Sequence, residues 1–122
     1  MSEFVSISIP AKAEHLLVVR LAASGVCSRI GMAIEQMEDV KAAVAEACIL
    51  MINDQAGYER LVVSFEYSDG LLVTVAGDAP GGMPQTDEID PDFSLALLEA
   101  LAQDVETGDG FVRFTARGGI NH

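Results

Sequence analysis

Cysteine and histidine are the residue types that most often supply nucleophiles and metal ligands, and this chain has two of each. Cys27 and Cys48 lie in separate apolar stretches without a Cys-x-x-Cys spacing, and neither has a histidine nearby to complete a zinc set. His15 and the terminal residue His122 are equally isolated. We therefore expect two reduced, buried thiols and no metal site.

The charge of the chain limits the partners that it can have. Its formal net charge is −12 at pH 7, and such a protein repels nucleic-acid phosphates and anionic membranes. Between residues 61 and 112 there is no Lys or Arg, whereas eleven Asp and Glu fall in that segment. We expect a protein partner with a basic face and no nucleic-acid or membrane partner. An acidic surface that is merely solvated explains the same segment equally well.

One carboxylate, that of Glu46, has a well-defined position in a helix. The helix is predicted over residues 35–54, where apolar residues recur at i, i+3, i+4 and i+7 and acidic residues occupy the first turn. The apolar residues are Val40, Ala43, Val44, Ala47, Cys48 and Met51. The neighbouring stripe places Glu46 and Leu50 one above the other at the margin of the buried face.

The other elements follow from local periodicity and turn residues. We expect a strand over 4–9, a helix over 12–28, a hairpin with strands 61–67 and 71–76, a long mobile loop over 77–92, a third helix capped by Asp92 or Ser94 and ending before Asp104, and a final strand over 111–116. The apolar residues that mark the first helix are Leu17, Val18 and Leu21, and those that mark the third are Phe93, Ala96, Leu97, Ala100 and Leu101.

This order of elements predicts an α+β fold, a two-layer α/β sandwich in which a mixed sheet carries the helices on one face. At 122 residues the chain has room for one hydrophobic core, so we expect a single domain over 1–122 with a loose tail at 117–122. It shows neither a signal-peptide pattern nor an apolar run long enough to span a bilayer, which favours a cytoplasmic protein.

Three segments, residues 7–20, 38–48 and 97–105, resemble in order and spacing the anti-sigma factor serine kinases of the RsbW and SpoIIAB type. That family belongs to the GHKL ATPases. The resemblance covers nearly the whole chain. It implies a Bergerat-type, histidine-kinase-like ATPase fold that binds ATP and magnesium and phosphorylates a STAS-domain protein on serine or threonine.

The resemblance assigns chemistry to the stripe of the central helix. In the family a Glu on this helix is the presumed general base, and an Asn four residues later supplies an oxygen to magnesium. The matching residues here are Glu46 and Leu50, and a leucine offers no oxygen to a hard cation. Asn53, one turn further along the stripe, is the alternative oxygen ligand.

The family's Asp-x-Gly-x-Gly pattern, whose Asp reads the adenine amino group, finds its nearest match in Asp78-Ala79-Pro80-Gly81-Gly82. The resemblance therefore implies nucleotide-binding roles for Asp78, Gly81 and Gly82. Pro80 replaces the first glycine, which fixes φ and removes an N–H. A one-residue shift of the match would place Gly77 at the Asp position.

The glycine-rich segment that cradles phosphates in the family falls on the start of the third helix. Asp92 and Ser94 stand there in place of two glycines. A carboxylate at a helix N-terminus competes for the N–H donors that hold a phosphate, and it repels the phosphate as well. Three nucleotide-binding elements are thus altered together, with residues 77–92 as a degenerate ATP lid.

From these residues we expect an anti-sigma regulatory factor that acts by binding a sigma factor, a STAS-domain antagonist or both, with no cofactor. Arg20 matches the family's first-helix Arg, which contacts both kinds of partner, although an exposed helical charge explains it equally well. The alternative is an active ATP- and magnesium-dependent serine kinase. A third hypothesis makes residues 77–92 an interaction loop for an unrelated partner. Members of the family commonly form dimers, so the resemblance also implies a homodimer.

Overall fold

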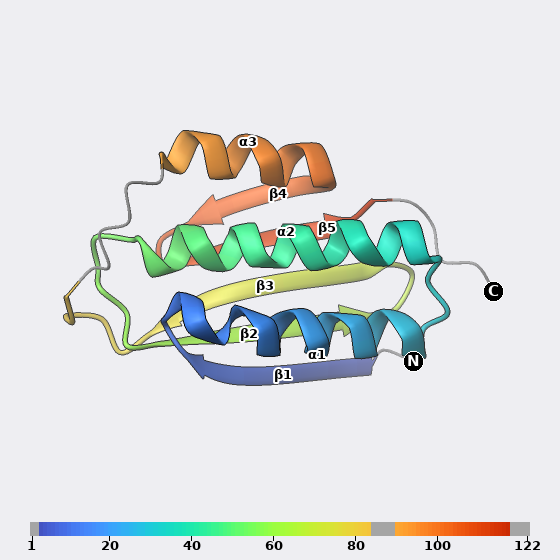
Figure 1. The fold of residues 1–122 in the computed structure, drawn as a ribbon, viewed down its shortest axis with the longest axis horizontal. Helices are drawn as coiled ribbons and strands as arrows, with labels where there is room; N and C mark the ends of the chain where they lie inside the picture. The colour runs from blue at the N-terminus through green and yellow to red at the C-terminus, as the bar shows by residue number, and fades with distance from the viewer. Residues whose placement is uncertain (1–2, 84–89, 118–122) are drawn as a thin grey trace.

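The computed structural model describes residues 3–83 and 90–117, which form one five-stranded sheet covered by helices (Figure 1). The elements in chain order are β1 (Glu3–Pro10), a short 3-10 turn (Ala13–His15), α1 (Leu16–Arg29), α2 (Ile34–Ile52), β2 (Arg60–Tyr67), β3 (Leu71–Asp78), α3 (Pro91–Leu101), β4 (Ala102–Gly108) and β5 (Phe111–Ala116). The tip of the expected 77–92 loop and the end of the expected 117–122 tail lie outside the described residues.

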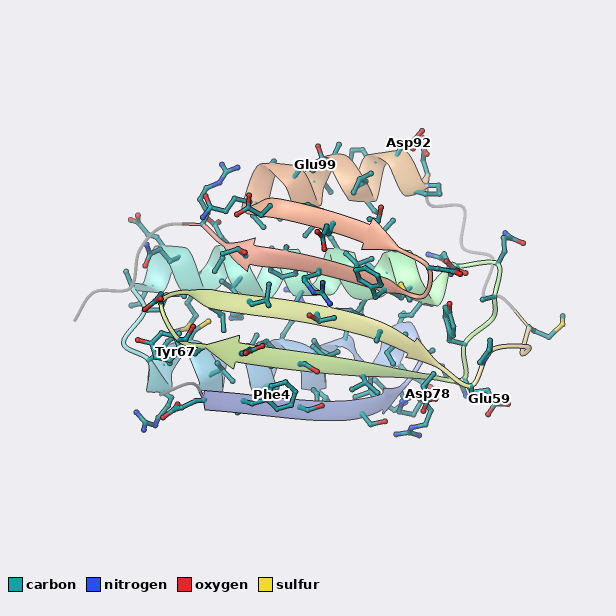
Figure 2. All side chains as sticks on the ribbon, turned by 180° about the vertical axis from the view of Figure 1, so that it is seen from behind. Phe4, Glu59, Tyr67, Asp78, Asp92 and Glu99 are labelled. Atoms are coloured by element: carbon teal, nitrogen blue, oxygen red, sulfur yellow. The ribbon has the colours of Figure 1, made fainter. Side chains whose placement is uncertain are left out.

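The strands lie in the order β1-β2-β3-β5-β4, and the three helices cover one face (Figure 1). The other face of the sheet is seen uncovered in Figure 2. This confirms the two-layer α+β sandwich. The expectation of a mixed sheet is wrong in one respect, because all four strand pairs are antiparallel. β3 and β4 do run in the same direction, but β5 lies between them and pairs with both.

The strand β4 is absent from the sequence prediction, which ran the third helix on toward Asp104. In the structure the helix ends at Leu101, and Ala102 is both its C-cap and the first residue of β4. The strand is hard to recognise because it forms an edge of the sheet and exposes most of its side chains. Its pairing with β5 also shifts register between Gln103 and Glu106, where Asp104 has a φ of 53°.

The core lies between α2 and the sheet. All six apolar residues predicted for the inner face of α2 are buried. They face the inward side chains of the central strands, which alternate with exposed or half-buried residues as the pleat requires. The buried strand residues include Leu61, Val63, Phe65, Leu71, Val73, Val75 and Phe114.

The inner face of α1 differs from the prediction. Val19, Ala23 and Cys27 are buried, whereas Leu17, Val18 and Leu21 are exposed. The buried residues recur every four positions and are small, which lets α1 approach α2 closely.

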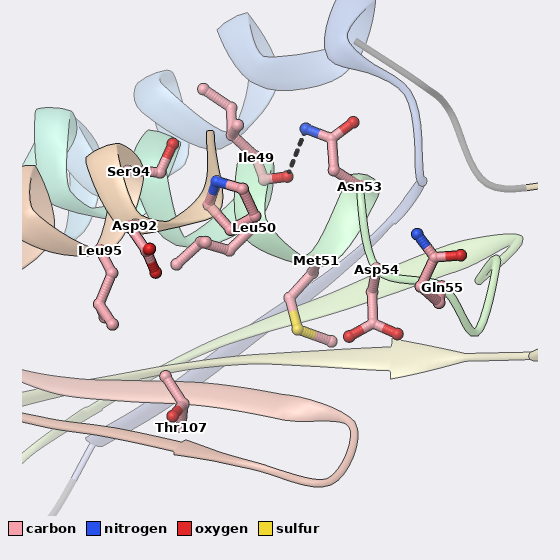
Figure 3. Close-up of a pocket in the computed structure, with 11 residues that line it drawn as sticks. Ile49, Leu50, Met51, Asn53, Asp54, Gln55, Asp92, Ser94, Leu95 and Thr107 are labelled. Atoms are coloured by element: carbon pink, nitrogen blue, oxygen red, sulfur yellow. Dashed lines mark hydrogen bonds between the residues drawn. The ribbon is translucent and has the colours of Figure 1, made fainter. Parts of the chain in front are cut away.

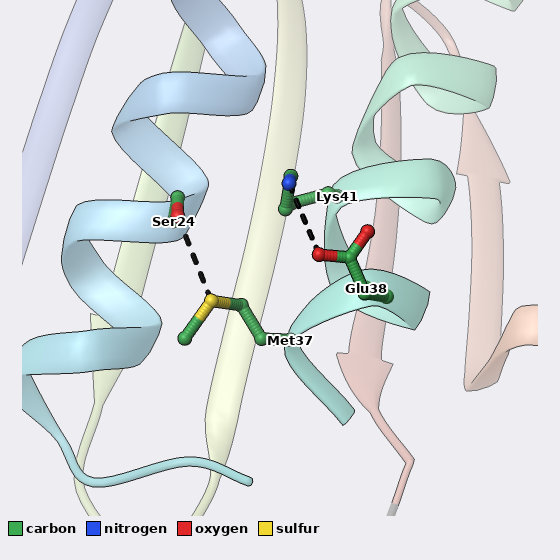
Figure 4. A network of polar contacts seen from close by, with 4 residues as sticks. All are labelled: Ser24, Met37, Glu38 and Lys41. Carbon is green, nitrogen blue, oxygen red and sulfur yellow. Dashed lines mark hydrogen bonds and ion pairs between the residues drawn. The ribbon is translucent and has the colours of Figure 1, made fainter. Parts of the chain in front are cut away.

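One polar contact joins the two helices, since Ser24 Oγ lies 3.5 Å from Met37 Sδ (Figure 4). The Glu38–Lys41 pair beside it has an N–O separation of 3.2 Å and lies within α2. As an exposed pair within one helix it adds little stability.

The expected inner face of α3 is also wrong. The buried residues are Ser94 and Leu98, while Phe93, Ala96, Leu97 and Ala100 are exposed and Leu101 is half-buried. Because α3 continues into β4 without a loop, the strand fixes the rotation of the helix about its axis. That rotation turns the more apolar stripe to solvent.

Within the described part of the chain, no helix is both long and apolar enough to cross a bilayer. Cys27 and Cys48 are free and buried, as expected. Burial raises the pKa of Cys27 to about 11 and that of Cys48 to about 12.

Candidate functional site

A cavity of about 340 Å³ lies between the end of α2, the start of α3 and strand β4 (Figure 3). Four of the residues singled out in the sequence line it: Leu50, Asn53, Asp92 and Ser94. The other lining residues are Ile49, Met51, Asp54, Gln55, Pro91, Leu95 and Thr107. The cavity thus brings together the metal-ligand position and the phosphate-loop position that the resemblance implied.

The backbone N–H groups at the start of α3 are already bound within the chain. The carboxylate of Asp90 accepts the N–H of Asp92 at 3.0 Å. The Asp90 carbonyl accepts the N–H groups of Phe93 at 3.0 Å and Ser94 at 3.3 Å. Two carboxylates, those of Asp90 and Asp92, face the positive end of the helix dipole. The bonds from Phe93 and Ser94 are those of the first turn of any helix, whereas the Asp90 side chain occupies the N–H of Asp92 and Pro91 has no N–H to offer. The two carboxylates also disfavour an anion at this end of the helix.

The α2 side of the cavity is mostly apolar. Leu50 occupies the position of the oxygen ligand, and Asn53 lies at the C-cap of α2. The side-chain N–H of Asn53 donates to the carbonyl of Ile49 at 3.0 Å. Its Oδ1 is buried without a hydrogen-bond partner among the described residues. Glu46 is half-buried one turn before Leu50 and does not line the cavity.

The segment after β3 lies apart from the cavity. Asp78, Gly81 and Gly82 do not line it, and Asp78 is exposed with its carboxylate accepting the N–H of Ala79 at 2.9 Å. The N–H groups of Gly81 and Gly82 donate to the carbonyls of Ala56 and Gly57, each at 2.8 Å. These donors are consumed by the loop that precedes β2.

Close packing explains the glycine at position 82 without any ligand. A Cβ there would lie 2.9 Å from the Gly57 carbonyl oxygen, which is too close for any other residue. The structure therefore gives Gly82 a role in holding two loops together.

Three features of this site count against the binding of ATP with magnesium. Asp90 caps the start of α3, Leu50 stands at the position that the resemblance gives to an oxygen ligand, and Asp92 brings a carboxylate to the cavity. No group of three or more His, Cys, Asp or Glu in the described part of the chain is arranged to hold a metal ion.

The first helix presents a second candidate surface. Arg20 is exposed on α1 and has no hydrogen bond or ion pair to other described residues. Leu17 and Leu21 beside it are 65% and 63% exposed, and Val18 is 49% exposed. Leu17, Arg20 and Leu21 lie on one side of the helix, and we call these three residues the α1 face. An arginine among exposed aliphatic side chains is typical of a protein-binding surface.

The residues at the site that the sequence analysis missed include Asp90 and Thr107. Asp90 is the N-cap of α3, a position assigned to Asp92 or Ser94, and the Asp-Pro pair at 90–91 is the signal that could have found it, since proline favours the first helical position. Thr107 lies on the unrecognised strand β4, so no local pattern pointed to it.

Known proteins with similar sequences agree on one family, although no family model matches the chain. A serine-protein kinase RsbW of Halalkalibacterium halodurans is 31% identical over 123 residues, covering 85% of this chain and 75% of the relative. A serine-protein kinase RsbW of Bacillus pumilus is 48% identical over 109 residues, covering 83% and 67%. The chain belongs to the RsbW family. The match to the RsbW of Bacillus mycoides, 38% identical over 78 residues, spans 61% of this chain and about half of that relative, 48% of its length.

Membership in the RsbW family confirms the resemblance that the three sequence segments indicated. The two-layer sandwich with helices on one face agrees with the ATPase-type fold that this resemblance implied. The roles of Glu46, Asp78, Gly81, Gly82 and Arg20 stay predictions.

Proposed function

We propose that this member of the RsbW family is an anti-sigma regulatory factor that acts by protein–protein binding without transferring phosphate. Its partners are a sigma factor, a STAS-domain antagonist, or both. The observation that carries the proposal is the start of α3, where Asp90 binds the N–H groups of Asp92, Phe93 and Ser94. When these N–H groups are bound within the chain, the protein keeps the fold of a kinase but lacks the donors that would hold the phosphates of ATP.

The α1 face supplies the binding surface of this proposal. Its arginine offers five N–H donors in a planar fork, which suits a carboxylate on a partner. The leucines on either side contribute apolar area that is exposed in the free protein. Arg20 lies at the edge of this apolar area, and arginine is among the residue types that most often carry the affinity of an interface.

Nucleotide binding is tested directly by calorimetric titration of the chain with Mg-ATP, together with thermal unfolding in its presence. We expect no heat of binding and no rise in Tm, because a ligand raises Tm only when it binds the folded protein. Stoichiometric binding of Mg-ATP would overturn the proposal.

Partner binding is tested by capture of purified sigma factors and STAS-domain proteins with the wild type and with Arg20→Ala. We expect binding in the absence of nucleotide and about tenfold weaker binding by the variant. If the chain captures neither class of protein but does capture another through residues 77–92, the third hypothesis replaces this one.

An active serine kinase is the second candidate, and one observation favours it. Asn53 Oδ1 is an unpaired oxygen in a residue that lines the cavity, so it is free to replace the ligand lost at Leu50. Incubation of the chain with labelled ATP and a STAS-domain protein tests this candidate. Transfer of phosphate that Asn53→Ala abolishes would establish it, and the absence of transfer agrees with the binding function.

We further infer that the protein works in the cytoplasm and as a homodimer. The first inference rests on the sequence pattern and the second on the family. Sedimentation equilibrium of the purified chain measures the second, and a monomer at all concentrations would contradict it.

A further inference from the structure

The outer side of α3 carries an exposed apolar stripe. Phe93, Ala96, Leu97 and Ala100 are spaced by three, four and seven residues, which places them on one face of the helix. Phe93 is 62% exposed and Leu97 is 36% exposed. We call these four residues the α3 stripe.

Acidic residues border the stripe. Asp92 and Glu99 are seven residues apart, so they lie above one another along the flank of α3, and both are exposed. Figure 2 shows them along the outer edge of the helix. The helix has no Lys or Arg of its own. Its border is therefore negative along two turns.

Arg117, a cation close to α3, is bound elsewhere. Arg117 donates from Nη2 to the backbone carbonyls of Glu99 and Ala102, each at 3.2 Å. It closes the C-terminal end of α3 and forms no described ion pair with the two carboxylates of the border. The carboxylates of Asp92 and Glu99 can therefore pair with cations of a partner.

The charge decides between the occupants that such a stripe could have. A second copy of the chain packed across a two-fold axis would bring two acidic borders together, which is unfavourable. Nucleic acid and anionic membranes are repelled by the same carboxylates. We propose that the α3 stripe is a docking site for an amphipathic helix of another protein, in which Lys or Arg flank an apolar face.

This surface is separate from the α1 face, and it adjoins the cavity through Asp92, which borders the stripe and also lines the cavity. α2 lies between α1 and α3 (Figure 1) and packs against both. Ser94 and Leu98 fill the side of α3 that is buried, whereas the stripe points outward. A helix on the α3 stripe therefore leaves the α1 face free, and a failure of the α1 proposal does not affect this one.

Two synthetic peptides of equal length test the proposal. One is an amphipathic helix with a leucine face flanked by lysines, and the other has glutamates in place of the lysines. We expect the lysine peptide to bind, the glutamate peptide not to bind, and the affinity to fall as NaCl is raised. Fluorescence anisotropy measures each Kd.

A matched pair of variants locates the binding. Phe93→Ser removes the aromatic residue of the stripe, and Phe4→Ser removes a phenylalanine of similar exposure, 64%, on the outer sheet face. We expect Phe93→Ser to weaken the lysine peptide about tenfold or more, because aromatic residues anchor such interfaces, and Phe4→Ser to leave it unchanged. Circular dichroism checks that both variants are folded.

Several outcomes would overturn the proposal. They are no binding of the lysine peptide, equal binding of the two peptides, or equal weakening by the two variants. Sedimentation and flotation with phosphatidylglycerol vesicles address the other occupants. Self-association or vesicle binding that Phe93→Ser abolishes would assign the stripe to a second copy or to a membrane.

Discussion

At the start of α3 the carboxylate of Asp90 accepts the N–H of Asp92, and its carbonyl accepts two more. Pro91 follows at the first helical position, where its missing N–H costs nothing. The side chain that begins the helix also places a carboxylate where a helix would otherwise attract an anion. In the function proposed above, this one residue both stabilises α3 and disfavours a phosphate.

Asp90→Ala should destabilise the protein by about 1 kcal/mol, because the N-cap side chain is lost and the N–H of Asp92 is left without its acceptor. Asp92→Ala is the matched control. Asp92 lies two residues after Asp90, in the first turn of α3, and its side chain is not the cap of the helix. Urea denaturation of both variants measures the difference. An equal effect of the two substitutions would show that Asp90 is not the cap.

The thiols of Cys27 and Cys48 should resist alkylation in the native protein. Burial raises their pKa from 9.0 to about 11 and about 12, so the reactive thiolate is scarce at pH 8. We expect iodoacetamide to modify both residues in urea and neither without it. Mass spectrometry counts the adducts, and fast native modification would contradict the burial.

The same pKa shifts make stability fall at high pH. The native state keeps protons that the unfolded chain releases above pH 9.0, so the contribution is complete below that pH and is lost as pH rises toward 11. Denaturation curves at pH 8 and pH 10 measure the change. An unfolding free energy that rises over this interval would contradict the sign.

At the scale of elements, α1 and α3 each expose several apolar residues to solvent and bury only two or three residues. For α1 the buried residues are Val19, Ala23 and Cys27, and for α3 they are Ser94 and Leu98. Both exposed faces therefore remain available to partners. The central helix α2 has no such exposed apolar face, because it packs against the sheet and is covered on its two sides by α1 and α3.

The rotation of α3 is tested by two neighbouring leucines. Leu98→Ala should cost about 2–5 kcal/mol, because Leu98 is fully buried and its truncation leaves a cavity. Leu97→Ala should cost less than about 1 kcal/mol, because Leu97 lies in the exposed stripe. Chemical denaturation of the two variants gives both values. A larger cost for Leu97→Ala would mean that the stripe, and not Leu98, faces the core.

At the scale of the whole molecule the excess of acidic residues dominates. The net charge of −12 on 122 residues destabilises the folded state, because the carboxylates repel one another when the chain is compact. The four ion pairs placed by the described residues are largely exposed and offset little of this repulsion. The charge therefore favours a partner with a basic surface, as proposed for the α3 stripe.

Salt should therefore stabilise the protein. Raising NaCl from about 10 mM to about 0.5 M shortens the Debye length from about 30 Å to only a few ångströms and screens the repulsion among carboxylates. We expect Tm to rise with NaCl at pH 7, as measured by differential scanning calorimetry. A Tm that falls would show that the exposed ion pairs outweigh the net charge.

The sequence determined by itself the class of fold, the helix α2 with its buried face, the hairpin of β2 and β3, and the family. These features depend on local periodicity and on motifs, both of which can be recognised in short segments of the sequence. It also indicated that Leu50, Asp92 and Ser94 alter a nucleotide site. The cap of α3 was missed although its signal is local, since Pro91 marks the first helical position and thereby assigns the cap to Asp90.

The tertiary structure alone decided which faces are buried. Leu17, Val18, Leu21, Phe93 and Leu97 have the spacing of core residues, yet all are exposed. A helix buries the side that its connections turn inward, and α3 is turned by the strand β4 that continues from it. Hydrophobic spacing fixes that a face exists, whereas packing against α2 and the sheet fixes where the face points.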